Sequence, residues 1–427
     1  MNLTTQKQDL APEMIGFNIQ TNKFKTKRIS LTFVLPLTKK GASTASLLSR
    51  LLSRSTKQYP NPVLLQRELL SLYGARLSSH MMKLGDAQLL NISITALENK
   101  YALQGENLTA AATELLCNSI FSPNCENGSF PAEDVEICRR LLIESLEGLI
   151  NDKRKYAISK MYSEMCANEP FGIELGGDIE TAKGITGEDI FSYWQTMLKT
   201  APVTVTVIGS DDPQPIFDEI TKRFCQLNRT PSPVNTRFFS KEVDAVKEFD
   251  ETMQLTQGKL VMGFRSEISS INQDNLPLRM MCDIFGGSPY SKLFTVVREK
   301  MSLCYYCAAR LQSQKGFICV DSGVDTVNIN AAKQGIMDQL TAIQNGDFDE
   351  DVIVASKMSL ADGARSVTDS AESIETWYLA RLFDQNQITP SQFIENLSAV
   401  TKDDIVKAAK SVVLDTVYTL RPMEETK

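Results

Sequence analysis

Histidine is almost absent from this sequence: His80 is the only one among 427 residues. A hydrolytic zinc site usually needs at least two imidazole or thiolate ligands, a carboxylate and an open position for water. Catalytic Ser-His and Cys-His pairs also depend on an imidazole. We therefore expect no bound metal, no cofactor and no catalytic residue, and an autonomous enzyme that uses another nucleophile is disfavoured.

An excess of positive charge and long apolar runs are also missing. The 45 Lys and Arg residues are outnumbered by 52 Asp and Glu residues, which gives a net charge of −7. This balance argues against a general grip on nucleic acid, which needs a basic face. No run approaches the ~18 apolar residues of a membrane span, and the first ten residues lack the apolar core of a signal peptide. We expect a cytoplasmic protein that binds neither nucleic acid nor membrane.

The nine cysteines, an odd number, fit reduced thiols better than a disulfide framework. Cys304 and Cys307 have the C-x-x-C spacing of redox and metal sites. Their segment reads as a half-buried strand, in which the two thiols would point to opposite faces. No second C-x-x-C is present to complete a zinc site. We therefore interpret the cysteines as small packing residues.

The chain matches itself at an offset of about 215 residues, which indicates an internal repeat. Each half contains a long helical pattern opened by a phenylalanine and acidic residues, a capping box before a second helix, and a β-rich run after it. The three pairs of segments are 130–135 with 348–352, 185–190 with 400–405, and 203–208 with 417–420. Chance recurrence of common capping chemistry is the alternative.

Both halves begin with strand-like alternation, at residues 29–36 and 259–264, before the helical patterns. A proline- and polar-rich stretch separates the halves and reads as a linker. We predict an N-terminal domain over 1–225, a linker over 226–245 and a C-terminal domain over 246–427. Each domain is expected to be α+β, with helices packed on a largely antiparallel sheet.

A helical stripe follows the first strand, between Ala45 and Thr56, with Ser46, Ser49 and Arg50 together on another face. Here the sequence resembles the pitrilysin and mitochondrial-processing-peptidase family, whose inverted zinc motif H-x-x-E-H lies on a helix after the first strand. The alignment places Ser46 and Arg50 at the two histidine positions and Ser49 at the catalytic glutamate. A fixed guanidinium repels a dication, so this resemblance implies a zinc-free chain.

The same four polar positions, Ser46, Ser49, Arg50 and Arg54, also fit a solvated helix face, and both interpretations exclude zinc catalysis. The family's third zinc ligand is a glutamate on a later long helix, and Glu144 matches it. Without histidines Glu144 cannot hold zinc strongly, and an ion pair with Arg50 is the alternative.

The lone His80 lies in a strand-like segment away from the altered helix. With its partners missing, an ordinary surface or core histidine is favoured there over a metal ligand.

The second half carries the more specific resemblance, over residues 285–305. A Gly-Gly turn opens a helix that ends in Arg-Glu-Lys, and a tyrosine follows the arginine by seven residues. In active family members this pair holds the substrate peptide, which implies substrate-binding roles for Arg298 and Tyr305, with Tyr306 as substitute if the register is off by one. An arginine at a helix end and a core tyrosine are the structural alternatives.

Family members with a broken zinc motif and an intact arginine-tyrosine pair typically form the non-catalytic half of a two-chain peptidase. The resemblance is closest to the inactive member of paired bacterial proteins described as associated with elongation factor P modification. It implies a partner, a zinc-bearing homologous peptidase subunit in a heterodimer, and a peptide substrate. A scaffold protein with the same fold is the alternative, and retention of Arg298 and Tyr305 favours substrate handling.

Overall fold

The computed structural model describes residues 3–234, 243–271, 274–384 and 387–423, and the predicted linker lies partly outside them. The chain forms two compact units, each assembled from separate stretches of sequence. Unit 1 comprises Met1–Glu147, Ile173–Thr236 and Ser370–Thr376; unit 2 comprises Gly148–Gly172, Arg237–Asp369 and Trp377–Lys427. Two short segments, 148–172 and 370–376, thus belong to the unit built mainly by the other half of the chain. The predicted domains, 1–225 and 246–427, are continuous and do not include this exchange.

Unit 1 is built on a six-stranded sheet in the order β1-β2-β6-β3-β5-β4. Its strands are β1 (Thr4–Ala11), β2 (Met14–Gln20), β3 (Thr26–Pro36), β4 (Arg76–Leu84), β5 (Ala87–Leu97) and β6 (Val203–Gly209). Every neighbouring pair is antiparallel except β2 with β6, which run parallel. The predicted strand at 29–36 lies within β3.

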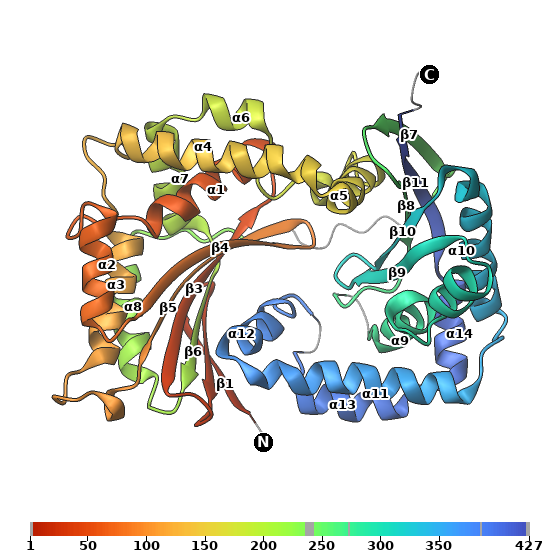
Figure 1. Cartoon of the computed structure of the whole chain (residues 1–427). Coiled ribbons are helices and arrows are strands. Elements are labelled where there is room, and N and C mark those ends of the chain that lie inside the picture. Colours follow the sequence, from red (N-terminus) through yellow and green to blue (C-terminus); the bar gives the residue numbers. More distant parts are fainter. Residues whose placement is uncertain (1–2, 235–242, 272–273, 385–386, 424–427) are drawn as a thin grey trace. The chain divides into compact units, whose positions relative to one another are not determined.

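The two faces of this sheet differ in chemistry because side chains alternate along each strand. Ile29, Leu31 and Phe33 of β3 belong to the main apolar core, which also contains residues of the helices. Ser30 and Thr32, between them, are equally buried and lie on the opposite face. Helices α2, α3 and α8 gather beside the sheet in Figure 1. Unit 1 therefore has an apolar, helix-covered face and a buried polar face.

Most of the helices that belong wholly or mainly to unit 1 begin at a residue whose side chain caps them. The helices wholly or mainly in this unit are α1 (Lys39–Leu52), α2 (Pro62–Ser71), α3 (Leu108–Phe121), α4 (Ala132–Gly148), α6 (Ile179–Gly184), α7 (Gly187–Thr200) and α8 (Gln214–Cys225). Asn61 and Asn107 cap α2 and α3 by accepting hydrogen bonds from backbone N–H groups.

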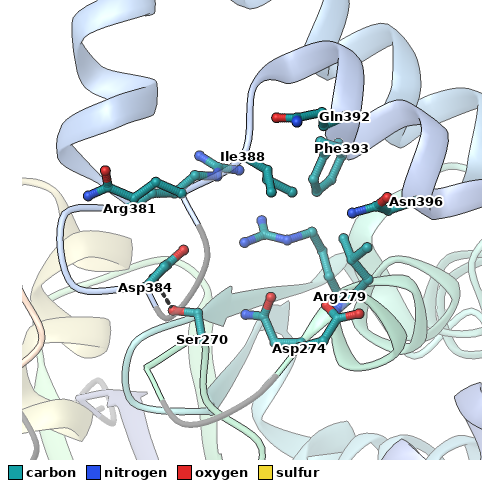
Figure 2. Close-up of a pocket in the computed structure, with 12 residues that line it drawn as sticks. Ser270, Asp274, Arg279, Arg381, Asp384, Ile388, Gln392, Phe393 and Asn396 are labelled. Carbon is teal, nitrogen blue, oxygen red and sulfur yellow. Dashed lines mark hydrogen bonds between the residues drawn. The ribbon is translucent and has the colours of Figure 1, made fainter. Parts of the chain in front are cut away.

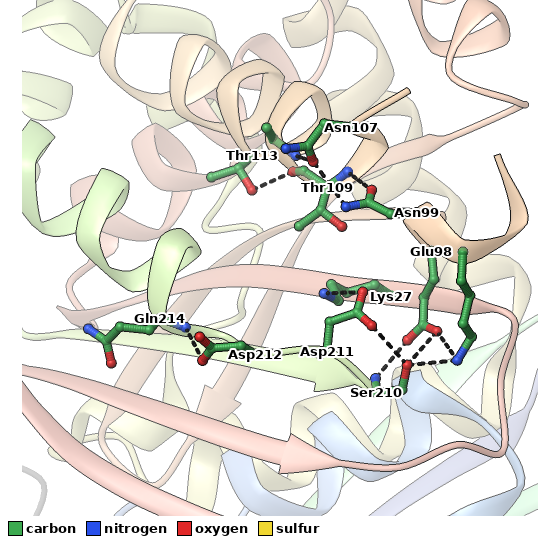
Figure 3. A network of polar contacts seen from close by, with 12 residues as sticks. Lys27, Glu98, Asn99, Asn107, Thr109, Thr113, Ser210, Asp211, Asp212 and Gln214 are labelled. Atoms are coloured by element: carbon green, nitrogen blue, oxygen red, sulfur yellow. Dashed lines mark hydrogen bonds and ion pairs between the residues drawn. The ribbon is translucent and has the colours of Figure 1, made fainter. Parts of the chain in front are cut away.

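A polar network ties together the ends of three strands of unit 1 (Figure 3). The buried Glu98, after β5, accepts hydrogen bonds from the Ser210 amide at 2.6 Å and forms an ion pair with Lys100 at 2.8 Å. Burial opposes ionisation of Glu98, but the hydrogen bonds from Lys100 and Ser210 outweigh it and lower the pKa of this carboxyl. Lys27 of β3 pairs with Asp211 at 3.2 Å.

Unit 2 repeats the plan of unit 1 with a five-stranded sheet in the order β7-β11-β8-β10-β9. Its strands are β7 (Lys247–Met253), β8 (Gly258–Arg265), β9 (Cys304–Gln312), β10 (Phe317–Val324) and β11 (Val413–Pro422). The parallel pair β7 with β11 occupies the place of β2 with β6, and the remaining pairs are antiparallel. The same strand order, directions and helix placement confirm two homologous α+β domains.

The helices of unit 2 include the counterparts that the repeat predicts. They are α5 (Lys153–Met165), α9 (Leu276–Cys282), α10 (Ile329–Gln344), α11 (Glu350–Ser366), α13 (Pro390–Ala399) and α14 (Lys402–Lys410), while α12 (Ala371–Leu379) runs through the end of the exchanged segment 370–376. Helices α4 and α11 both span 17 residues. Thr186 before α7 and Thr401 before α14 form complete capping boxes with the acid three residues later.

Candidate functional site

Helix α1 carries the altered motif and is buried on nearly all sides. It begins after its N-cap Thr38 and ends at Leu52, so it starts earlier and ends earlier than the predicted stripe. The Ser46 hydroxyl donates to the Leu175 carbonyl at 3.1 Å, and the Ser49 and Ser79 hydroxyls lie 2.7 Å apart. The interpretation of Ser46 and Ser49 as part of a solvated face is wrong, because β4 and the segment before α6 cover them.

Arg50 and Glu144 do not meet. Arg50 is half-buried and forms no ion pair within the described residues. Glu144, on α4, lies 3.8 Å from Arg140 one turn earlier and its side chain is 59% exposed. Arg54, two residues after the end of α1, instead forms an ion pair with Asp134 of α4, at 2.6 Å. The predicted Arg50 to Glu144 pair is therefore wrong, because Glu144 lies nearly three turns further along α4 than Asp134.

His80 lies on β4 and faces away from α1. Its neighbour Ser79 points to α1, and its partner in the adjacent strand is Asn91, on the buried polar face. Burial lowers the pKa of His80, while Glu375 raises it and Arg28 lowers it to smaller extents. Across the part of the chain that the structure describes, no group of three or more His, Cys, Asp or Glu residues is placed to hold a metal ion.

Arg298 and Tyr305 are brought together in unit 2. Arg298 lies on a π-helical segment, η5 (Leu293–Lys300), and Tyr305 lies near the start of β9. The Arg298 Nε donates a hydrogen bond to the Tyr305 carbonyl at 3.0 Å, and its guanidinium carbon lies 4.5 Å from the centre of the Phe294 ring. The Tyr305 side chain points outward and the residue is 65% exposed. A partly exposed arginine and an exposed tyrosine thus lie next to each other.

A β-bulge produces this arrangement. Tyr306 pairs with Gly323 on β10 and Cys304 pairs with the next residue, Val324, so that Tyr305 has no partner. Such a bulge locally breaks the alternation of a strand and redirects one side chain. The inference that Tyr305 is exposed while its neighbour is packed therefore depends on strand pairing, and the sequence of β9 alone does not contain it.

Tyr306 occupies a different environment from Tyr305. Its ring lies 4.4 Å from the guanidinium carbon of Arg154 and 5.5 Å from the Lys259 ammonium. Burial, and then the nearby Asp321 carboxylate, raise the pKa of the Tyr306 phenol to about 12. Of the two adjacent tyrosines, Tyr305 is exposed, whereas Tyr306 is partly buried against Arg154 and Lys259.

The bulge also corrects our expectation for the C-x-x-C pair. Cys304 and Cys307 are both buried and lie within hydrogen-bonding contact on the same face, not on opposite faces. A hydrogen bond from the Cys307 thiol lowers the pKa of Cys304 to about 7, against the opposing effect of burial. The hydrogen bond to Cys304, and burial after it, raise the pKa of Cys307. The C-x-x-C spacing was the one sequence signal for this contact.

We expect Cys307→Ala to raise the pKa of Cys304 from about 7, because the thiolate loses the donor that stabilises it. Thiolate absorbance near 240 nm, followed against pH in a Cys225→Ser background, measures the change; Cys225 is the exposed cysteine. Burial raises the pKa of Cys117, Cys166 and the other core thiols, which keeps them out of the neutral range. A neutral-range transition that survives Cys304→Ala would contradict this assignment.

Comparisons with known proteins agree with the fold. Residues 184–360 match the family described as "Peptidase M16 inactive domain". The chain is 31% identical over 406 residues to "Probable inactive metalloprotease YmfF" of Bacillus subtilis (strain 168), covering 95% of both. A crystal structure of a conserved protein from Enterococcus faecalis V583 matches with a TM-score of 0.90 at 29% identity, over 99% of this chain and 100% of that one.

A more distant solved structure supports the same fold. The peptidase M16 inactive domain from Pseudomonas fluorescens matches all of both chains with a TM-score of 0.79 at 13% identity. No helix in the described part of the chain combines the length and apolar character needed to cross a membrane. The resemblance seen in the sequence is confirmed by these matches: the chain belongs to the M16 peptidase family, as an inactive member with Ser46 and Arg50 at the histidine positions of the zinc motif.

Proposed function

We propose that this chain is the non-catalytic subunit of a heterodimeric zinc peptidase and that it binds the peptide substrate through Arg298 and Tyr305. The observation that carries the proposal is the bulge that turns the 65% exposed Tyr305 outward beside Arg298. Bulges are frequent next to active sites, where they re-aim a side chain. A guanidinium fork suits a peptide carbonyl or carboxylate, and a tyrosine hydroxyl donates to a developing oxyanion.

The partner we propose is a homologous subunit with an intact H-x-x-E-H motif. This chain offers Ser46, Ser49 and Arg50 at the corresponding positions, two of them buried and engaged with Leu175 and Ser79. Zinc and the catalytic glutamate must then come from the second chain. All nine cysteines are free thiols, which supports a reducing compartment and hence the cytoplasm as the place of this complex.

Purified alone, the chain is expected to contain no stoichiometric zinc and to cleave no peptide. Co-expression with a homologue that carries H-x-x-E-H is expected to yield a complex with peptidase activity. Metal content by plasma mass spectrometry and cleavage of a quenched fluorescent peptide library measure both results. Stoichiometric zinc with cleavage by the isolated chain, after removal of contaminating proteases, would overturn the proposal.

In the active complex, Arg298→Ala and Tyr305→Phe should each lower kcat/KM by about tenfold to a hundredfold, because each removes a donor to the bound peptide. Tyr306→Phe is the matched control, since it removes the hydroxyl of the packed tyrosine. Lys300→Ala, at the end of the same π-helical segment as Arg298, controls for a change of surface charge. Assembly is checked by size-exclusion chromatography. Unchanged kinetics in an intact complex would favour the scaffold alternative.

A further inference from the structure

Unit 2 contains a pocket of about 510 Å³ beside α9 and α13 (Figure 2). Arg381, Asp384, Gln387 and Ile388, which follow α12 in the sequence, also line it. Its volume lies within the range of roughly 300–1,000 Å³ that is usual for small-molecule sites. Two arginines, Arg279 and Arg381, line it, and neither has a role in the function proposed above.

Several hydrogen-bond donors in this pocket have no acceptor. Arg279 donates through Nη2 to Ser313 at 2.6 Å, but its Nε is buried without a partner. Arg381 donates through Nη1 to the Trp377 carbonyl at 3.1 Å and stacks on the Trp377 ring, and neither guanidinium forms an ion pair with any described residue. The Nδ2 of Asn275, a residue that is 8% exposed, is also buried and unpaired. Buried donors of this kind normally have partners.

The pocket also holds two carboxylates, Asp274 and Asp384, but among the described residues neither forms an ion pair with the two arginines. Burial, and after it the positive charge of Arg279, lower the pKa of Arg381 to about 10. Asp384 accepts a hydrogen bond from Ser270 at 2.5 Å; burial raises the pKa of Asp384, and Ser270, Arg381 and Arg279 lower it to smaller extents. Asp274 is exposed at the rim. Two like charges in a partly dehydrated site favour a bound anion, since an anion would relieve their repulsion and accept from the unpaired donors.

The remaining wall is apolar. The Phe393 ring is buried and flanked by both guanidinium groups, with its centre 5.9 Å from the Arg279 and 5.8 Å from the Arg381 guanidinium carbon. Ile388 lies beside it (Figure 2). We propose that this pocket binds a small organic anion, whose carboxylate or phosphate group is held by Arg279, Arg381 and Asn275 and whose apolar part lies on Phe393 and Ile388.

Isothermal titration of the full chain with phenyl phosphate, benzoate and inorganic phosphate tests the proposal. Phenyl phosphate or benzoate is expected to bind saturably at up to millimolar concentration, and the preferred one assigns the anionic group. Inorganic phosphate is expected to bind more weakly than phenyl phosphate, because it has no ring to place on Phe393. Arg279→Gln should weaken binding by about tenfold to a hundredfold, whereas Arg365→Gln, an exposed arginine on α11, should not change it.

A second variant keeps the test independent of folding defects. Gln392 lines the pocket and also completes the capping box of α13 with Thr389. Gln392→Glu keeps that capping box, because glutamate fills the same role, and adds a negative charge to the pocket. It should weaken anion binding without lowering the melting temperature. Absence of saturable binding by the wild-type chain, or equal affinities in wild type, Arg279→Gln and Gln392→Glu, would overturn the proposal.

Discussion

Replacing Arg265 by methionine is expected to lower the free energy of unfolding of unit 2 by about 3–5 kcal/mol. Arg265 lies at the end of β8 in a buried cluster of two cations and two carboxylates. Its guanidinium lies 2.6 Å from Glu169 and 2.5 Å from Asp415, and Lys315 lies 2.8 Å from the other oxygen of Glu169. Methionine preserves much of the volume but leaves two buried carboxylates facing one ammonium.

The two tryptophans make this measurement specific, because Trp194 belongs to unit 1 and Trp377 to unit 2. In a Trp194→Phe background, urea denaturation followed by fluorescence reports on unit 2. The matched control is Arg421→Met, which removes an arginine of β11 from its partly exposed pair with Asp250 and should cost less than about 1 kcal/mol. Equal losses for the two variants would contradict the importance of burial.

A double variant separates the unpaired charge from the lost packing. Adding Asp415→Leu to Arg265→Met removes one of the two carboxylates and leaves the neutral Glu169 and Lys315 pair. We expect the double variant to recover part of the loss, because the penalty of breaking a buried ion pair comes mainly from the partner left uncompensated. A double variant less stable than Arg265→Met would show that the lost packing dominates.

The sequence predicted the fold well because the repeat depends on local signals. The capping boxes at Thr186 and Thr401, and the long helices that follow residues 130 and 348, are determined by side chains within a few positions of each other. The exchange of segments 148–172 and 370–376 is not local. Glu169 and Glu375 form ion pairs with arginines about 100 and 350 residues away in the sequence. The residues next to them in the sequence do not indicate a buried ion pair.

The sequence indicated which residues form the candidate site, but not how their side chains are oriented. The resemblance placed Arg298 and Tyr305 together, and the structure places them in contact. Which tyrosine faces outward, and whether Cys304 and Cys307 share a face, depend on the pairing of β9 with β10. An alternation rule applied to β9 alone gives the wrong face for the thiols, because one unpaired residue inverts it.

Replacing Glu375 by alanine is expected to destabilise unit 1 by about 3–5 kcal/mol, because it leaves the buried Arg28 without its counter-ion. Glu375 lies 2.6 Å from the Arg28 Nε, accepts from Asn91 at 2.9 Å and also accepts from Ser30. Hydrogen exchange of peptides from β3 and β5 measures the loss. Glu372→Ala, an exposed glutamate on the same helix, is the control and should leave that exchange unchanged.

The lone His80 gives an independent reading of the same cluster, because a single imidazole produces one set of NMR signals. Burial lowers the pKa of His80 from 6.5, and the Glu375 carboxylate raises it. Glu375→Gln keeps the size of the side chain and should lower the pKa of His80 further. The folded chain favours neutral His80, so the pKa of His80 is lower in the folded than in the unfolded chain. Between these two pKa values the unfolded chain binds more protons, and stability therefore falls as the pH drops below about 6.5. His80→Asn should remove that dependence. A pKa of His80 at or above 6.5 in the folded chain would contradict the effect of burial.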